Sequence, residues 1–148
     1  MARGLISTIC ACLIYANAFA VALAQSNPQD LQGGWTAVSA RQDGKPADNL
    51  VGHVLTFTGN SFRIQAKDGK LLYAGTATAQ PNTNPAAIDF AITEGAQKGK
   101  SWKGIFEIKG SSLTICDNAP DSEKARPSAF ETKGGSGYVL VTFQRVNP

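Results

Sequence analysis

His53 is the only histidine in the chain, so it limits the catalytic and metal chemistry that the sequence can offer. A triad would use it as the base toward a serine or toward Cys116. No nucleophile elbow accompanies it, because residues 134–137 read Gly-Gly-Ser-Gly and lack the G-x-S-x-G spacing. A zinc site needs two or three further ligands, and residues 25–148 offer no other His and one Cys. We predict no catalytic site and no metal site, with His53 at the core margin; contact with a ligand is the alternative.

A second candidate is the glycine- and lysine-rich segment 95–101, Gly-Ala-Gln-Lys-Gly-Lys-Ser, which looks like a phosphate-binding loop. That motif requires four residues between its glycines and a helix after the serine. Here three residues separate Gly95 from Gly99, and a strand-like segment follows. The segment is therefore predicted to be a solvated hairpin loop.

The remaining reactive side chains form no catalytic pattern. Cys116 is predicted to be an inert thiol, with a reactive thiol or an intermolecular bridge as alternatives. The carboxylates show no pairing at catalytic spacing, and most are expected to be solvated. They are Glu94, Glu107, Asp117, Asp121 and Glu123. The sequence thus predicts a protein that is not an enzyme and uses no cofactor.

The first 24 residues have the organisation of a signal peptide. Arg3 is followed by an apolar run from Leu5 to Leu23, and residues 22–24 form an A-x-A cleavage site. We expect export to the periplasm or beyond, cleavage after Ala24, and one domain over residues 25–148. An uncleaved membrane anchor is the alternative; after cleavage no integral membrane segment is expected. Cys10 and Cys12 lie in this segment, which leaves Cys116 without an internal disulfide partner.

The elements that must position any site are short strands. Eight segments alternate apolar and polar residues, with turn signals such as Asp43-Gly44-Lys45-Pro46 between them. Short links favour neighbour-to-neighbour pairing, and closure into a barrel avoids two exposed edges. We predict an all-β, antiparallel, up-and-down eight-stranded barrel; a sandwich is the alternative. The segments are 35–41, 51–58, 62–66, 71–79, 87–93, 101–109, 113–116 and 138–146.

Two residues at opposite ends of this pattern are predicted to close the barrel. Trp35 follows Gly33-Gly34 in the first strand, and Arg145 lies near the end of the last. The first and last strands of a closed barrel are neighbours. Trp35 and Arg145 are therefore expected to stack as a guanidinium over an indole.

The order of several short motifs resembles that of a known family. The motifs are Leu31-Gln32-Gly33-Gly34-Trp35, Asp43-Gly44-Lys45-Pro46, Ala87-Ile88-Asp89-Phe90, Thr93-Glu94-Gly95, Lys98-Gly99-Lys100, Gly104-Ile105-Phe106-Glu107, Leu113-Thr114-Ile115-Cys116, Arg126-Pro127 and Gly135-Ser136-Gly137. Together they resemble small secreted lipocalin-like domains, abundant in bacteria such as the planctomycetes, whose function is not established. Gly33-x-Trp35 also resembles the first-strand motif of true lipocalins. The resemblance implies a lipocalin-like barrel and no activity.

The pattern predicts a binding module for a small hydrophobic or amphipathic molecule. Small residues on segment 71–79, together with Gly104, leave room inside the barrel. The long loop 117–135 carries Arg126, which is expected at the rim, where it would neutralise an anionic head group. Aromatic side chains are expected to line the interior, namely Phe57, Phe62, Phe90, Trp102 and Phe106.

The alternative is a protein-interaction or inhibitor module whose barrel is filled. A net charge of +3, scattered along the chain, gives no reason to expect nucleic acid. The sequence indicates no particular protein partner.

Overall fold

A computed structural model describes residues 28–147, and the predicted signal peptide lies outside the described residues. Within this range, no helix is long and apolar enough to span a membrane. Two short 3₁₀ helices accompany the strands: η1 (Pro28–Leu31) and η2 (Asp48–Leu50). The strands are β1 (Gly33–Gln42), β2 (Lys45–Pro46), β3 (Val54–Thr58), β4 (Ser61–Gln65), β5 (Leu71–Gln80), β6 (Ala86–Gly95), β7 (Ser101–Lys109), β8 (Ser112–Asp117) and β9 (Val139–Arg145).

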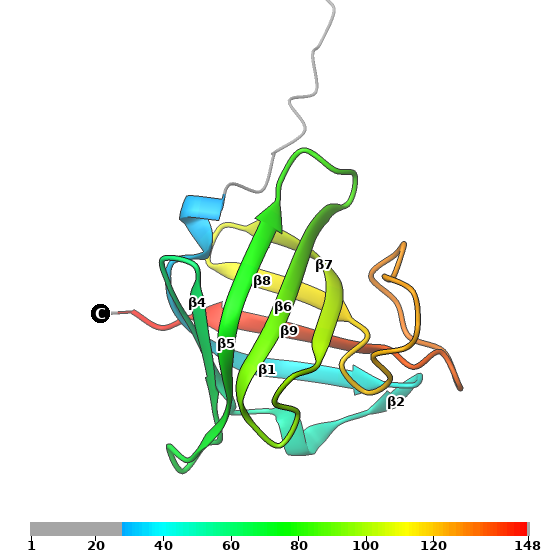
Figure 1. Ribbon diagram of the computed structural model, residues 1–148, viewed down its shortest axis with the longest axis horizontal. Coiled ribbons are helices and arrows are strands. Elements are labelled where there is room, and N and C mark those ends of the chain that lie inside the picture. Colours follow the sequence, from blue (N-terminus) through cyan, green and yellow to red (C-terminus); the bar gives the residue numbers. More distant parts are fainter. Residues whose placement is uncertain (1–27, 148) are drawn as a thin grey trace, which may run out of the picture.

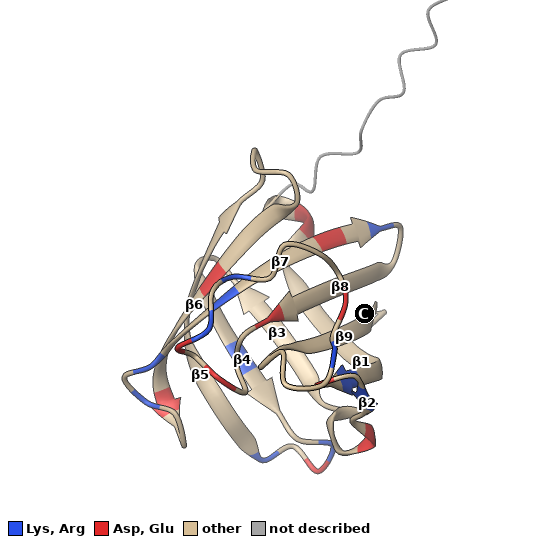
Figure 2. Ribbon diagram, turned by 90° about the vertical axis from the view of Figure 1, so that its right-hand side faces the viewer, with Lys and Arg blue, Asp and Glu red and all other residues tan. Residues whose placement is uncertain are grey.

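The strands form a closed antiparallel barrel (Figure 1). From β3 to β9 each strand pairs with its neighbour in sequence, and β1 pairs with both β3 and β9. The two-residue β2 is a short arm that pairs only with the end of β1. The predicted all-β, up-and-down, eight-stranded barrel is confirmed, and it is consistent with a lipocalin-like fold. Acidic and basic residues are interspersed over its surface (Figure 2).

One predicted strand begins later than expected. Val51, where the strand was predicted to start, instead follows η2 directly, and a turn at Gly52, whose φ of +88° suits glycine, precedes the start of β3 at Val54. His53 precedes β3, and its carbonyl oxygen accepts a hydrogen bond from the Ala37 amide at 2.8 Å. Val51, His53 and Leu55 lie at every second position, which is the spacing of one face of a strand. A turn before the strand can show the same spacing, so the pattern predicts a strand that is too long.

A bulge in β1 sets which of its residues face inward. The register against β9 shifts between Ala37 and Ser39, and Val38 bulges outward with 48% of its surface exposed. Strict alternation would place Ala37 and Gln42 on opposite faces of the strand. The extra residue brings both to the inner face, where they line the same cavity.

Trp35 and Arg145 lie against each other at one end of the barrel. They are register partners on β1 and β9, and the Arg145 guanidinium carbon is 4.1 Å from the centroid of the Trp35 ring. Trp35 is fully buried, and its indole Nε1 donates to the Leu31 carbonyl at 2.7 Å. Arg145 donates to the carbonyls of Gln32 at 2.8 Å and Asp30 at 2.5 Å. The pair therefore joins the first strand, the last strand and η1 into one floor.

We expect Arg145→Ala to destabilise the barrel by about 1–3 kcal/mol, because the substitution removes the stack and two charge-assisted hydrogen bonds. In thermal unfolding followed by circular dichroism, each kcal/mol lowers Tm by about 3–6 °C. Arg63→Ala, at an exposed position on β4, is the matched control. Equal melting temperatures for the two variants would contradict the role given to Arg145.

Candidate functional site

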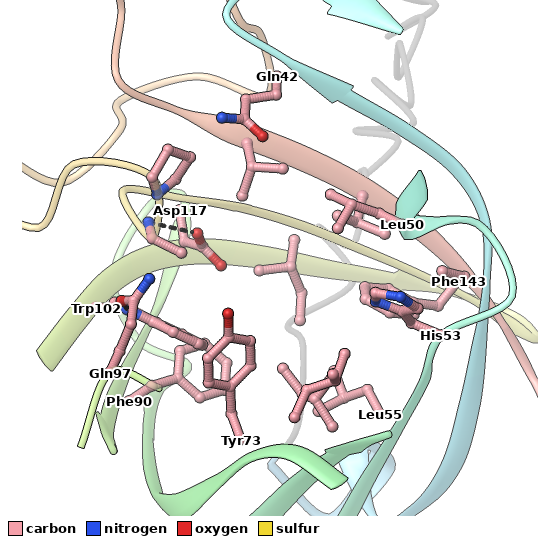
Figure 3. A pocket seen from close by; sticks show the side chains of 18 of the residues that line it. Gln42, Leu50, His53, Leu55, Tyr73, Phe90, Gln97, Trp102, Asp117 and Phe143 are labelled. Atoms are coloured by element: carbon pink, nitrogen blue, oxygen red, sulfur yellow. Dashed lines mark hydrogen bonds between the residues drawn. The ribbon is translucent and has the colours of Figure 1, made fainter. Parts of the chain in front are cut away.

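A cavity of about 400 Å³ opens at the end of the barrel opposite η1 (Figure 3). It is enclosed by the end of β1, the η2 segment, the start of β5, the β6–β7 loop, the end of β8 and the start of β9. Most of its wall is hydrocarbon. The apolar lining residues include Ala37, Leu50, Leu55, Ile64, Leu72, Phe90, Trp102, Ile115, Val139, Val141 and Phe143.

An aromatic cluster closes the inner end of this cavity. Phe62 packs edge-on against Phe90, with ring centroids 4.9 Å apart, and lies 6.4 Å from the ring of Trp102. Tyr73 packs edge-on against Trp102 at 5.1 Å. Such contacts fix ring positions as well as burying area. The middle of the barrel is thus filled, and the cavity occupies the half away from Trp35.

The five aromatic residues predicted to line a pocket have different positions. Phe90 and Trp102 line the cavity, while Phe57 lines a smaller one of about 270 Å³ beside η1. Phe62 and Phe106 are fully buried in the core and line neither of these two cavities. Contact of Phe90 and Trp102 with a ligand stays a prediction.

Arg126 lies elsewhere than expected. It does not line the cavity; its guanidinium is bound at the outer side of β6 and β7. There it pairs with Asp89 at 2.6 Å and donates to the carbonyls of Gly104 at 2.7 Å and Ile88 at 3.2 Å. The predicted rim position is therefore corrected: these acceptors hold Arg126 and fasten the long loop to the barrel wall.

The long loop runs from β8 to β9 at the end of the barrel away from η1 (orange in Figure 1). Beyond the Arg126 contacts, the Glu131 carbonyl lies 3.6 Å from the Cys116 sulfur, and Asp43 accepts from the Gly137 amide at 2.7 Å. Of the loop residues, Ala119 and Pro120 line the cavity. The loop is thus anchored mainly to the outside of the barrel.

The small residues predicted to leave room have other uses. A Cβ at Gly75 would lie 1.9 Å from the Ala91 carbonyl oxygen, so this glycine permits close contact of β5 and β6. Ala77 and Ala79 line the smaller cavity beside η1. A Cβ at Gly104 would lie 2.9 Å from the Cβ of Asp117, whose side chain occupies that space. These small residues therefore do not account for the larger cavity. It exists because the aromatic cluster leaves that end of the barrel unfilled.

Asp117 is the polar residue that the sequence reasoning missed. It is one of five carboxylates of which most are expected from the sequence to be solvated, and the predicted strand ends one residue earlier, at Cys116. In the structure β8 extends to Asp117, and the side chain shares the inward face of Leu113 and Ile115. Only 9% of its surface is exposed. Extending the alternation of Leu113 and Ile115 by two residues would have indicated its direction.

Burial determines the acidity of Asp117. Its Oδ1 accepts a hydrogen bond from the Ala119 amide at 2.8 Å, the one donor that residues 28–147 provide to this carboxyl (dashed in Figure 3). Loss of water around the charged form raises the pKa of Asp117 to about 7, and the Ala119 hydrogen bond opposes the rise. A carboxyl that titrates near neutral pH therefore lies in a mostly apolar cavity.

Other polar groups surround the same space. His53 lines the cavity, and partial burial lowers the pKa of its imidazole. The Trp102 indole donates to the Gln97 side chain at 2.7 Å, which orients both. The Tyr73 hydroxyl points into the cavity toward the side that carries Asp117 (Figure 3). Among the described residues, no three His, Cys, Asp or Glu side chains are grouped to hold a metal ion.

Cys116 faces away from the cavity, on the opposite side of β8 from Asp117. It is fully buried, and burial, with smaller contributions from the nearby Asp117 and Glu131 carboxylates, raises the pKa of its thiol to about 12. The thiolate, which is the reactive form, is therefore strongly disfavoured. This environment agrees with the inert thiol expected from the sequence.

Comparison of the chain with protein-family models, curated proteins and solved structures gives no match.

We expect Asp117→Asn to stabilise the protein at pH 8 and to change little at pH 4. Folding raises the pKa of Asp117 from 3.8 to about 7, so the folded state binds the proton more tightly. The stability contributed by this proton is complete below pH 3.8 and is lost as the pH rises through 7. The gain at pH 8 is about 4 kcal/mol at most, because each pKa unit corresponds to about 1.4 kcal/mol.

Denaturant unfolding of wild type and Asp117→Asn between pH 4 and pH 8 measures this difference. Asp121→Asn, in the loop that follows Asp117 but outside the cavity lining, is the control. A constant difference between wild type and Asp117→Asn across this range would show that Asp117 titrates normally.

Proposed function

We propose that this protein is a non-enzymatic carrier that binds a small hydrophobic or amphipathic molecule inside the barrel. The observation that carries the proposal is the cavity of about 400 Å³, which opens at the end opposite the Trp35–Arg145 floor. Ligand sites in proteins are concave and largely apolar, with a few polar groups that fix orientation. The wall of Phe90, Trp102 and Val141 with Asp117 at one side has this composition.

The volume limits the ligand. Binding pockets for small molecules span about 300–1,000 Å³, so this cavity lies near the lower end of the range. A compact or short-chain molecule fits it better than a long fatty acyl chain. The apolar part of the ligand would contact the aromatic cluster, and its polar part would lie toward the β8 end.

Two further parts of the proposal rest on the sequence. Export follows from the signal-peptide pattern of residues 1–24, and a carrier in the periplasm or outside the cell would meet ligands from the medium. The proposal also includes membership of the family of small secreted lipocalin-like domains, and the motifs that resemble that family support it. The alternative, an interaction or inhibitor module, was expected to have a filled barrel; the cavity favours the carrier.

We expect Leu50→Trp to weaken strongly the saturable binding of N-phenyl-1-naphthylamine, an apolar fluorescent probe that is uncharged at neutral pH. Leu50 lines the cavity from η2, and an indole there would occupy much of the space. The affinity should fall at least about tenfold in a fluorescence titration. Val51→Trp, at the adjacent exposed residue outside the lining, should bind the probe like wild type. Equal binding by both variants, or no saturable binding by wild type, would contradict the proposed carrier function.

A further inference from the structure

The side chains that line the cavity have an uneven charge composition. Of the described residues that line it, none is lysine or arginine, and its ionisable side chains are Asp117, His53 and Tyr73. Lys98 and Lys100 belong to the β6–β7 loop, but both are exposed and outside the lining. The cavity therefore offers a ligand one acidic group and no fixed positive charge.

Two cations of the long loop that could neutralise Asp117 have other partners. Arg126 pairs with Asp89 and with two backbone carbonyls on the outer side of the barrel. Lys133 pairs with Glu131 at 3.0 Å, and both side chains are largely exposed. Neither cation lines the cavity.

The Asp117 carboxyl therefore keeps acceptor capacity that the protein does not use. An ionised carboxylate can accept about four hydrogen bonds, whereas Ala119 supplies one. Burying such a group without partners is costly, and a ligand that brings a donor would recover part of that cost. A donor with positive charge would recover more, because charge-assisted hydrogen bonds are stronger than neutral ones.

We propose that the ligand is an apolar amine, whose protonated nitrogen binds the Asp117 carboxylate while its hydrocarbon part lies against Phe90 and Trp102. This inference rests on the proposed carrier function and specifies the chemical class of its ligand. A fatty acid is disfavoured, because its carboxylate would meet Asp117 as a like charge in a poorly hydrated space. The Tyr73 hydroxyl and the Gln97 side chain lie on the walls near Asp117, where they can contact the amine or its neighbouring atoms (Figure 3).

Three probes of equal chain length test the inference: octylamine, octanol and octanoate, titrated calorimetrically into the purified protein at pH 8. A primary alkylamine is protonated at this pH, as a lysine side chain is. We expect octylamine to bind at least about tenfold more tightly than octanol, and octanoate at least about tenfold more weakly.

The Asp117→Asn variant assigns the effect to one side chain. It should lower the affinity for octylamine to within about threefold of that for octanol. Octanol affinity should stay near the wild-type value, which also shows that the variant is folded and its cavity intact. Asp121→Asn should retain the wild-type order of affinities. Loss of the amine preference in Asp117→Asn alone would support the proposal.

The other outcomes distinguish the two proposals. Octanol binding without any amine preference, or tightest binding of octanoate, would overturn the amine ligand and leave the carrier function standing. An amine preference that persists in Asp117→Asn would overturn the role of Asp117. Absence of binding by all three probes would contradict the carrier function itself.

Discussion

The stack of Arg145 on Trp35 is the interaction on which the rest of the molecule depends. A sheet becomes a barrel only when its first and last strands pair, and this contact lies where β1 meets β9. Arg145 also holds the backbone of the η1 segment through two carbonyls, and Trp35 holds it through a third. One end of the barrel is thereby closed with side chains and backbone, and the larger of the two cavities described opens at the other end.

At the open end of the barrel, a tightly packed aromatic cluster lies next to a buried carboxyl group whose ionised form destabilises the folded state. Phe62, Phe90 and Trp102 fill the middle of the barrel and give the cavity a rigid base. Asp117 lies above this base, and burial raises the pKa of its carboxyl to about 7. A buried acid with one hydrogen-bond donor destabilises the folded state at neutral pH, and such groups concentrate at binding sites. Gly104, which leaves space for Asp117, is part of the same arrangement.

The sequence predicts the fold better than the site, and particular residues explain why. Alternation and turn residues identify the barrel, and adjacency of its ends predicts the contact of Trp35 with Arg145, because both depend on local pattern and closure. The position of Arg126 depends on the path of the long loop, which has no periodic pattern, whereas that of Asp117 depends on where β8 ends. The loop carries Arg126 to the outer wall beside Asp89, and one additional residue of β8 turns Asp117 inward. Neither the outer position of Arg126 nor the inward direction of Asp117 can be predicted from residue type alone.

Fluorine NMR of protein labelled with 5-fluorotryptophan tests the central claim most directly, because the chain has two tryptophans and they report on opposite ends of the barrel. Trp102 lines the cavity, whereas Trp35 lies under Arg145 at the floor. The Trp102→Phe variant assigns the two signals. On titration with octanol, the account predicts a saturable shift of the Trp102 signal and an unchanged Trp35 signal. A shift confined to Trp35, or no shift of either signal, would contradict it.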